Sequence, residues 1–250
     1  NKINLMKIAI VRGTFLAGYE GQIFYPLVKK HKITAFASLH PYHDKFPFKV
    51  VKLPSPMDFP FGPVNRLKMP ILNRCFIDAH WLIGLEDKLN GFDIAHTADT
   101  FYHYSHQCVV AKKQGKVKKV VATVYENIPF NNRGIWGREK YIKDVLENVD
   151  HFIAISERSK ASLVLEGVED SRITVITQHI DTKRFIPRIE KNSSNNLTIL
   201  FTGRVEFYKG VYEIIYSAKR LLSDSELSKF NLHFVIVGNG SEKNQLRELV

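Results

Sequence analysis

Two cations five residues apart flank a short loop near the end of the chain. Arg204 follows Gly203 where the apolar run 197–202 ends, and Lys209 precedes Gly210 where a helical pattern begins. N–H groups at a helix N-terminus attract anions, a guanidinium can bind a diphosphate at two points, and an ammonium adds a point charge. The pattern therefore indicates a phosphate-binding loop. Taken alone, the motif also fits a plain turn with two solvated cations.

A second loop suited to ligand binding follows the first strand-like run, at residues 7–11. Gly13, Gly18 and Gly21 lie between this run and a helical pattern, and glycine lets the backbone approach a ligand closely. Their spacing is neither Gly-x-Gly-x-x-Gly nor a Walker motif, which disfavours a dinucleotide or kinase-like site. We predict that Gly13 and Gly18 contribute to ligand binding, with a plain turn as the alternative.

Polar residues also mark the end of the strand-like run 93–98. His96 lies within this run, Asp99 follows it, and His103 comes four residues later. Ligands of open α/β sheets bind at the carboxyl edge of the strands. We predict Asp99 as a general base, His96 as a positioning residue of the catalytic site, and His103 as a further candidate for this site. A purely structural hydrogen-bonding role is the alternative for His96.

Glu126 and Asn127 follow the strand-like run 119–124, at the same predicted sheet edge. Pro129 fixes the turn after them and leaves both side chains free to reach a cleft. They are suited to hydrogen bonding with the hydroxyl groups of a ligand. Capping of the local turn is an equally good explanation.

Apolar strand-like runs alternate with helical patterns, which predicts an α/β fold with a largely parallel sheet. We expect strands at 7–11, 33–38, 49–53, 93–98, 119–124, 151–155 and 173–177. We expect helices at 20–30, 71–90, 100–114, 137–148 and 157–166.

A polar stretch suggests a domain boundary. We predict a first domain at 1–186, a linker at 187–197 and the start of a second domain at 198–250. The second domain begins with strand 197–202 and helix 210–222, whose apolar residues share one face. A strand at 232–237 follows.

Composition excludes several protein classes. The hydrophobic content of 44% suits a packed core, and two cysteines, Cys75 and Cys108, are too few for a disulfide framework. No apolar run reaches the ~20 residues of a membrane span, and no signal-peptide pattern opens the chain, so we expect a cytoplasmic protein. No Asp-x-Asp motif and no zinc-ligand spacing occur, so we predict no metal and no cofactor.

The chain has a net charge of +11, which lies mostly in the first domain. Its densest basic cluster is Lys112, Lys113, Lys116, Lys118 and Lys119. Nucleic acid and anionic lipid head groups are both candidate partners for such a cluster, and membrane-surface contact suits a membrane-borne acceptor. A solvated helix end is the simpler explanation.

Several segments occur in an order that resembles the interdomain part of family-4 retaining glycosyltransferases. The resemblance extends through the Arg204 loop to Gly238-Asn239-Gly240 and covers about residues 150–250, whereas the first 150 residues agree in layout only. The matching segments are 152–157, 165–168, 173–177, 179–185, 203–210 and 234–240.

The resemblance implies a GT-B fold, in which two Rossmann-like parallel-sheet domains face a cleft, the second being only partly present here. It implies transfer of a hexosyl group from a nucleoside-diphosphate sugar to a glycan or lipid-linked acceptor hydroxyl, with retention of configuration. In this reaction Arg204 and Lys209 would stabilise the departing diphosphate, with Gly210 beside it, and Gly13 and Gly18 would contribute to donor binding. Asp99 would accept the proton of the acceptor hydroxyl, and the acceptor-side candidates for hydrogen bonding to sugar hydroxyls are Glu126, Asn127 and His103.

The sequence also departs from the family pattern. Many members place two histidines at a strand end; the first matches His96, but Ala98 occupies the second position, which puts the usual histidine role in doubt. The family's second domain continues with a Glu-seven-residues-Glu motif that has no counterpart before Val250. We therefore interpret the chain as part of a longer enzyme, which leaves the separate activity of these 250 residues in question.

Three alternative functions stay open. A noncatalytic sugar-nucleotide-binding or partner subunit would keep the phosphate-binding loop and tolerate Ala98. A nonhydrolysing epimerase of the same fold is the nearest enzymatic competitor. A nucleic-acid-binding protein would fit the pI near 9.5, but no helix-turn-helix, zinc-ligand set or stacking platform accompanies the basic cluster, so no nucleic acid is expected.

Overall fold

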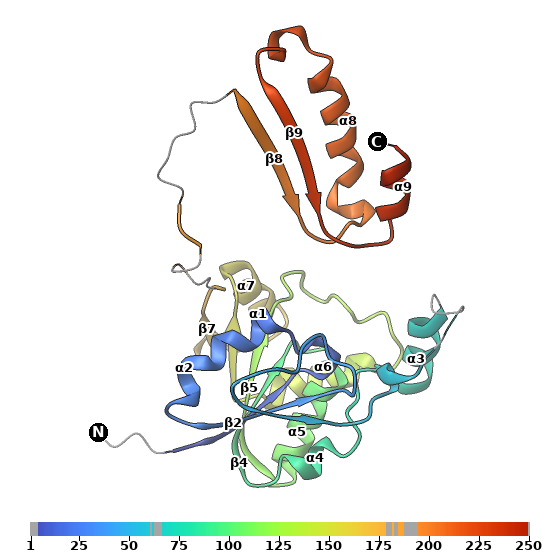
Figure 1. Ribbon diagram of the computed structural model, residues 1–250. Helices are drawn as coiled ribbons and strands as arrows, with labels where there is room; N and C mark the ends of the chain where they lie inside the picture. The colour runs from blue at the N-terminus through green and yellow to red at the C-terminus, as the bar shows by residue number, and fades with distance from the viewer. Residues whose placement is uncertain are drawn as a thin grey trace. The chain divides into compact units, whose positions relative to one another are not determined.

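The computed structural model describes residues 5–60, 62, 67–178, 182, 185–187 and 195–249. The chain divides into two compact units, Asn1–His179 and Ile180–Val250, and each is considered by itself (Figure 1). Most of the predicted linker, at 188–194, lies outside the described residues.

The first unit contains a parallel sheet whose seven described strands have the order β3-β2-β1-β4-β5-β6-β7 (Figure 1). Its strands are β1 (Lys7–Val11), β2 (Lys32–Ala37), β3 (Lys49–Lys52), β4 (Phe92–Ala98), β5 (Val117–Val124), β6 (His151–Ala154) and β7 (Ile173–Val175). All seven lie where the sequence pattern predicted strands. The α/β class with a parallel sheet is thus confirmed.

Helices connect these strands. They are α1 (Gly18–Gly21), α2 (Tyr25–Val28), α3 (Lys68–Phe76), α4 (Leu85–Lys88), α5 (His103–Lys113), α6 (Arg138–Asn148) and α7 (Glu157–Leu165). Single 3₁₀ turns occur at Gly13–Phe15, Gln22–Phe24, Pro56–Asp58 and Asp170–Arg172. The predicted helix 20–30 is split into short pieces by the turn at Gln22–Phe24.

The single helix predicted at 71–90 is wrong. The chain forms α3 and α4 instead, because Ile77 and Gly84 take positive φ angles of 64° and 78° and the segment between them is irregular. A left-handed residue ends the α-helical path, and the hydrophobic spacing of a sequence does not reveal such a break.

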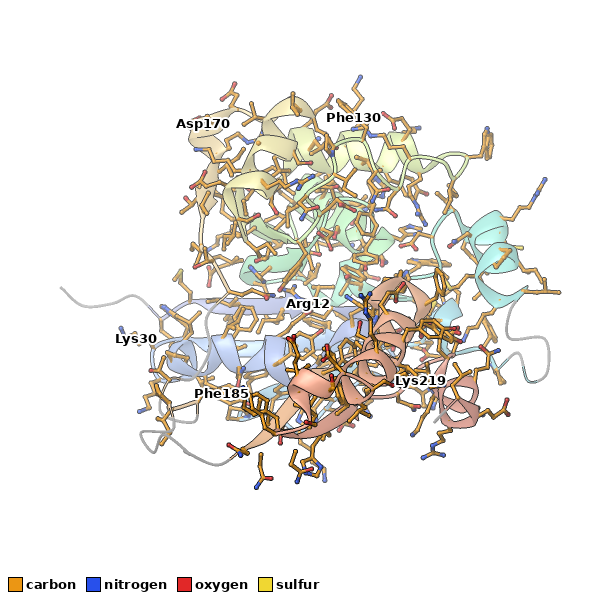
Figure 2. All side chains as sticks on the ribbon, turned by 90° about the horizontal axis from the view of Figure 1, so that it is seen from above. Arg12, Lys30, Phe130, Asp170, Phe185 and Lys219 are labelled. Carbon is orange, nitrogen blue, oxygen red and sulfur yellow. The ribbon has the colours of Figure 1, made fainter. Side chains whose placement is uncertain are left out.

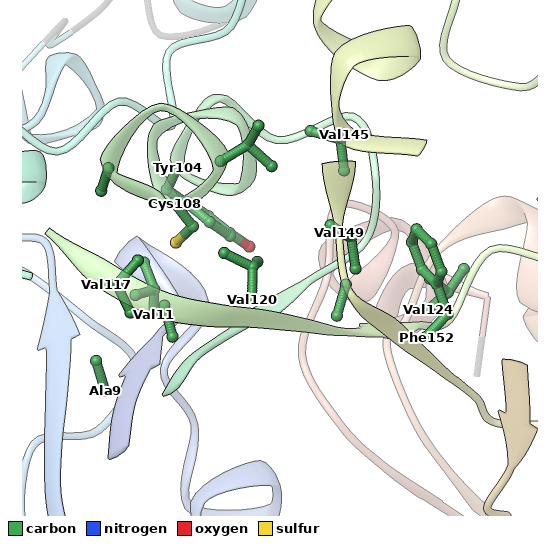
Figure 3. Packing of buried hydrophobic residues seen from close by; sticks show 14 of the residues in the cluster. Ala9, Val11, Tyr104, Cys108, Val117, Val120, Val124, Val145, Val149 and Phe152 are labelled. Atoms are coloured by element: carbon green, nitrogen blue, oxygen red, sulfur yellow. The ribbon is translucent and has the colours of Figure 1, made fainter. Parts of the chain in front are cut away.

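Apolar clusters lie on both faces of the sheet. The larger cluster joins the sheet to α5 and α6; Figure 3 shows Tyr104 and Cys108 of α5 beside Val117 and Val120 of β5. In the smaller cluster Phe24 packs against Ile10 of β1 and Ile33 of β2. These strand residues alternate with those of the larger cluster and therefore point to the other face of the sheet. Helices on both faces make this a doubly wound sheet.

The second unit is a parallel pair of strands, β8 (Asn196–Thr202) and β9 (Asn231–Val237), packed with α8 (Val211–Leu222) and α9 (Lys243–Glu248). Its small core consists of Val205, Val211, Ile215 and Leu246. The predicted strands 197–202 and 232–237 and the helix 210–222 are confirmed. Single 3₁₀ turns occur at Phe207–Lys209 and Ser225–Leu227.

Candidate active site

The strand order of the first sheet reverses between β1 and β4. Loops that leave the carboxyl ends of two such strands run to opposite faces, which opens the crevice where ligands of doubly wound folds bind. Arg12 and Gly13 follow β1, His96 lies within β4, and Asp99 follows β4. The structure thus brings three predicted site residues, Gly13, His96 and Asp99, to one point, together with Arg12.

Arg12 was not among the predicted site residues. Its side chain is 1% exposed, and Nη1 donates to the carbonyl oxygens of Val11 at 2.9 Å and His96 at 3.2 Å. Its Nε lies 3.4 Å from Oε2 of Glu20 on α1, whose pKa is raised by burial although Arg12 opposes the shift. Figure 2 labels this arginine. The sequence signal was an arginine between an apolar strand and a loop glycine.

His96 is held by hydrogen bonds at both ring nitrogens. Nη2 of Arg12 lies 3.1 Å from Nδ1, and Oγ1 of Thr123 lies 3.0 Å from Nε2. A guanidinium can only donate, so Nδ1 accepts and Nε2 carries the proton that it donates to Thr123. Burial, together with the charge of Arg12, lowers the pKa of His96 well below its usual value. The neutral ring therefore positions Arg12 and has no nitrogen left for proton transfer with a ligand.

Asp99 is a buried carboxylate at the end of β4, with 7% of its surface exposed. Its Oδ1 accepts backbone N–H groups of Tyr125 at 2.8 Å and Glu126 at 3.2 Å. Its φ is +53°, a left-handed conformation that Asp and Asn tolerate better than most residues. Burial raises the pKa of Asp99 to about 6, although the two N–H groups and Arg12 oppose this shift. Such a carboxylate can exchange a proton near neutral pH.

The two predicted loop glycines differ in their environment. Gly13 has φ of +55°, a conformation that strains other residues, and a Cβ there would make a tight contact of 3.3 Å with the ring of Tyr104. Gly18 begins α1 with φ outside the left-handed region, and a Cβ there would keep an ordinary 3.8 Å from His43. Of these two glycines, Gly13 is thus the one whose backbone conformation favours glycine.

His103 belongs to a different set of contacts. Its backbone N–H donates to Oδ2 of Asp78 at 2.7 Å, and its ring stacks on Trp81 with centroids 5.8 Å apart. Burial lowers the pKa of His103. Within the described part of the chain no hydrogen bond joins it to His96 or Asp99, so its contacts serve the start of α5.

The pair Asp78 and His80 was also absent from the predicted site. Oδ1 of Asp78 lies 2.8 Å from Nδ1 of His80, whose ring stacks on Phe15 with centroids 4.8 Å apart. Burial acts to raise the pKa of Asp78, but His80, the His103 N–H and Arg138 together hold it below the ordinary value. Phe15 lies in the turn after β1, so this pair supports the Gly13 loop.

Glu126 and Asn127 do not share one role. Oε1 of Glu126 accepts the backbone N–H groups of Asn127 at 2.9 Å and Ile128 at 3.0 Å, and Oε2 accepts the side-chain amides of Asn131 and Asn132. Both oxygens of Glu126 thus fix the loop after β5, as the turn-capping explanation proposed. Asn127 has an exposed side chain.

Arg204 and Lys209 gather around one aromatic ring in the second unit. The guanidinium carbon of Arg204 lies 5.6 Å from the ring centroid of Tyr208, and Nζ of Lys209 lies 5.3 Å from it. Both cations are exposed, and neither forms an ion pair with any described residue. Glu206, the carboxylate of this loop, accepts a hydrogen bond from Oγ of Ser241 at 2.8 Å. Two positive charges are thus held near each other and open to an anion.

The N-terminus of α8 lies beside these cations. Gly210 is its N-cap residue with φ of +70°, and no side chain caps the first turn. A left-handed conformation of this kind favours glycine. The free N–H groups of a twelve-residue helix supply further donors to an anion bound there.

Gly238 and Gly240 fix the backbone that carries Arg204. A Cβ at Gly238 would lie 1.9 Å from the carbonyl oxygen of Gly203, and one at Gly240 would lie 2.1 Å from that of Val205. The N–H of Val205 donates to the carbonyl of Asn239 at 2.9 Å. The loop after β9 therefore packs directly on the loop after β8, which only glycines allow.

Each lysine of the basic cluster is paired with an aspartate. Lys112 and Lys119 both contact Asp150, at 2.7 Å and 2.8 Å. The other pairs are Lys113 with Asp144, Lys116 with Asp87 and Lys118 with Asp93. The aspartates are distant from these lysines in the sequence. The sequence segment 112–119 therefore shows an excess of positive charge, whereas in the fold nearby aspartates compensate that charge.

Metal-binding groups and membrane-spanning helices are both absent from the described residues. No group of three or more His, Cys, Asp or Glu side chains there is arranged to hold a metal ion. None of the helices in the described ranges has the length and apolar character to cross a membrane.

The doubly wound sheet with a candidate site at its reversal point, followed by a second parallel α/β unit, forms a GT-B fold. Residues 28–184 match the family model described as Glycosyltransferase Family 4. The chain belongs to this family.

Curated relatives are similar over part of their length. A phosphatidylinositol N-acetylglucosaminyltransferase subunit from Arabidopsis thaliana is 27% identical over 161 residues, which cover 62% of this chain and 34% of the relative. An uncharacterized glycosyltransferase of Methanocaldococcus jannaschii is 26% identical over 171 residues, which cover 63% of this chain and 43% of that protein. The chain spans about a third of the length of the first of these relatives.

Solved structures share the fold at low identity. Anabaena HepE, in complex with UDP and glucose, is 14% identical with a TM-score of 0.64, over 98% of this chain and 64% of that one. S. aureus MnaA, in complex with UDP, is 14% identical with a TM-score of 0.55, over the same shares of the two chains. These likenesses bear on the fold alone.

Proposed function

We propose that this chain is part of a glycosyltransferase that moves a hexosyl group from a nucleoside-diphosphate sugar to an acceptor hydroxyl, with retention of configuration and without a metal ion. Membership of Glycosyltransferase Family 4 supports the reaction class. The donor assignment rests on the pair Arg204 and Lys209. Both cations lie near the ring of Tyr208, and the N-terminus of α8, which no side chain caps, follows them directly.

The proposed donor site acts on the leaving group. When the bond between the anomeric carbon and the diphosphate oxygen breaks, its electron pair moves onto the diphosphate. Arg204, Lys209 and the N–H groups of α8 then stabilise a charge that is larger in the transition state than in the bound donor. Fixed protein cations replace the divalent ion that many sugar transferases use, so the proposal includes no cofactor and no metal.

Asp99 is the proposed acceptor base. Its raised pKa, about 6, leaves it largely ionised at pH 7 and still able to take the proton of the attacking hydroxyl. His96 positions Arg12, and Arg12 places a buried positive charge near the carboxylate. Asn127, with its exposed amide, is the acceptor-side residue that we retain for hydrogen bonding to sugar hydroxyls.

Product analysis tests the reaction type. The natural full-length protein should release nucleoside diphosphate only when an acceptor extract is present, and the sugar should appear on that acceptor. Release of nucleoside diphosphate that does not depend on acceptor, or an epimerised donor, would assign the protein to the alternative of a nonhydrolysing epimerase. The UDP-N-acetylglucosamine 2-epimerase of Rickettsia bellii, which shares the fold at 14% identity with a TM-score of 0.55, keeps that alternative in view. Binding without turnover would indicate a noncatalytic partner subunit.

We assign the proposed membrane contact to the surface formed by α3 and the loop at 134–136. Trp136 is 92% exposed and shares a groove with Pro70 and Arg74, while Ile71 of α3 is 45% exposed. No Asp or Glu occurs between Asp58 and Asp78, so the cation of Arg74 suits an anionic head group. The paired lysine cluster offers no comparable free charge. A cytoplasmic protein working at a membrane surface fits this arrangement.

Tryptophan fluorescence measures this contact. Vesicles of phosphatidylcholine with anionic phosphatidylglycerol should shift the emission of Trp136 to shorter wavelength, because an indole entering the interface leaves water. The only other tryptophan, Trp81, stacks on His103. The Trp81→Phe variant should keep the shift and Trp136→Phe should lose it. An unshifted spectrum of Trp81→Phe at every vesicle concentration would contradict the assignment.

A further inference from the structure

Three neighbouring strands of the first sheet begin with lysine. They are β1 at Lys7, β2 at Lys32 and β3 at Lys49. Lys7 is in register with Lys32, and Lys49 is in register with Thr34, two residues beyond Lys32. Residues two apart on a strand share a face, so all three lysines belong to one face at the amino edge of the sheet.

These lysines line a groove of about 420 Å³. Small-molecule sites are commonly of roughly this size. Residues around the turn between α4 and β4 form another part of it, and three apolar side chains are among its lining. The lining residues are Lys7, Lys32, Thr34, Phe36, Lys49, Val51, Lys88, Asn90, Gly91 and Phe92. The lining therefore contains four lysines and no carboxylate.

The charges in this groove are not balanced within the described residues. No ion pair is formed there by Lys32, Lys49 or Lys88. Asp93, next to the groove residue Phe92, accepts the backbone N–H of Lys7 and pairs with Lys118. The five lysines at 112–119 differ in this respect, since each contacts an aspartate. Like charges in register on adjacent strands repel one another, and a bound anion would relieve that repulsion.

We propose that this groove is a binding site for a ligand that carries at least two phosphate groups. Ammonium groups bind phosphate as point charges, and the side chains of Phe36, Val51 and Phe92 would contact an apolar ring or chain of the ligand. A soluble polyphosphorylated metabolite and the phosphorylated head group of a lipid share this chemistry. The site is distinct from the candidate active site, because parallel strands place Asp99 at their carboxyl edge and these lysines at their amino edge.

Inositol hexakisphosphate, titrated calorimetrically into the full chain, is the soluble probe. The triple variant Lys32→Gln, Lys49→Gln, Lys88→Gln should bind it at least about 10-fold more weakly. The matched control is Lys29→Gln, Lys30→Gln, Lys45→Gln, which removes three exposed lysines that lie outside the groove lining. It should bind within about 2-fold of the wild type. Equal weakening of the two triple variants would overturn the proposal, since it would reflect net charge alone.

Two further measurements keep the test decisive. Vesicles that contain phosphatidylinositol 4-phosphate distinguish the sources: binding to them but not to the soluble probe indicates a lipid head group. Binding to neither probe overturns the site, as does a groove-dependent affinity for short RNA that exceeds the affinity for both. If the triple variant does not fold, Lys32→Gln and Lys32→Arg replace it, and only the charge-preserving change should keep the probe-induced rise in melting temperature.

Discussion

Replacing Arg204 with alanine in the natural full-length protein is expected to lower kcat by at least about 100-fold, and Lys209→Ala should have an effect of similar size. Each cation is proposed to stabilise charge that develops on the leaving diphosphate, so the loss falls on turnover more than on donor KM. The rate of nucleoside diphosphate release at saturating donor measures this. Arg204→Lys should be intermediate, because it keeps the charge and loses the guanidinium fork.

Matched controls exist in the same unit. Lys219 and Arg220 are exposed in the last turn of α8, and their replacement by alanine removes the same charges from the other end of that helix. These variants should keep wild-type kcat. All four alanine variants should keep the wild-type melting temperature, because each side chain is exposed. Near-normal turnover in both Arg204→Ala and Lys209→Ala would remove this loop from the mechanism.

Asp99→Asn is expected to abolish most transfer activity and, at the same time, to stabilise the fold at neutral pH. Asparagine keeps the acceptor oxygen for the N–H groups of Tyr125 and Glu126 and tolerates a φ of +53°. It cannot take a proton from the acceptor. A loss of about 100-fold or more in kcat is the expected size for a missing general base.

The stability effect has a defined pH dependence. Burial raises the pKa of Asp99 from 3.8 to about 6, so the folded state favours the protonated acid. Its stabilising contribution is complete below pH 4 and is lost as the pH rises to 6 and beyond. At one pKa unit per 1.36 kcal/mol, the shift corresponds to at most about 3 kcal/mol. Asp99→Asn should thus raise the free energy of unfolding at pH 7.5 and change it little at pH 4.

Urea unfolding at the two pH values checks this prediction. Asp150→Asn is a useful comparison, because ion pairs and hydrogen bonds with Lys112 and Lys119 lower the pKa of that carboxyl despite its partial burial. Its replacement should destabilise the protein near neutral pH and matter less in acid. A destabilised Asp99→Asn protein at pH 7.5, or one with normal turnover, would show that the Asp99 carboxylate is structural.

The fold was predictable because its signals are local. Apolar strand runs such as 7–11 and 119–124, with helical patterns between them, require burial on both faces and so imply a parallel sheet. The exception at 71–90 also has a physical basis. Ile77 and Gly84 adopt positive φ angles, and these do not alter the spacing of apolar residues in the sequence.

The location of a candidate site residue was predictable where the residue directly follows a strand or precedes a helix. Asp99 follows a buried strand, and the cations of the Arg204 loop precede a helix, so topology alone places them at a sheet edge. Arg12 was missed because an arginine after a strand is usually solvated, whereas here Glu20 and His96 hold it buried. The role of Glu126 was not predictable, because the loop conformation brings the side-chain amides of Asn131 and Asn132 to its carboxylate, which then has no oxygen left for a ligand hydroxyl.

Charge was the least readable property of the sequence. The lysines at 112–119 are the densest basic cluster of the sequence, with nucleic acid and lipid head groups as candidate partners. In the fold each of them pairs with an aspartate 25 to 38 positions away along the chain, and Asp150 pairs with two of them. By contrast, Lys32, Lys49 and Lys88 form no ion pair with a described residue. They are scattered in the sequence and line one groove because the parallel strands align their starts. Ion pairs between residues that are distant in the sequence therefore determine which lysines can contact an anionic ligand.

Arg204, Lys209 and the N-terminus of α8 are proposed to bind the diphosphate of the donor. Amide chemical-shift mapping by NMR with inorganic pyrophosphate addresses it directly, since the amides of 203–211 report on this loop separately from the lysine groove. We expect saturable shifts at these amides that disappear in the Arg204→Ala, Lys209→Ala double variant and persist in the Lys219→Ala, Arg220→Ala variant. Unshifted amides at 203–211, or equal shifts in the first double variant, would contradict it.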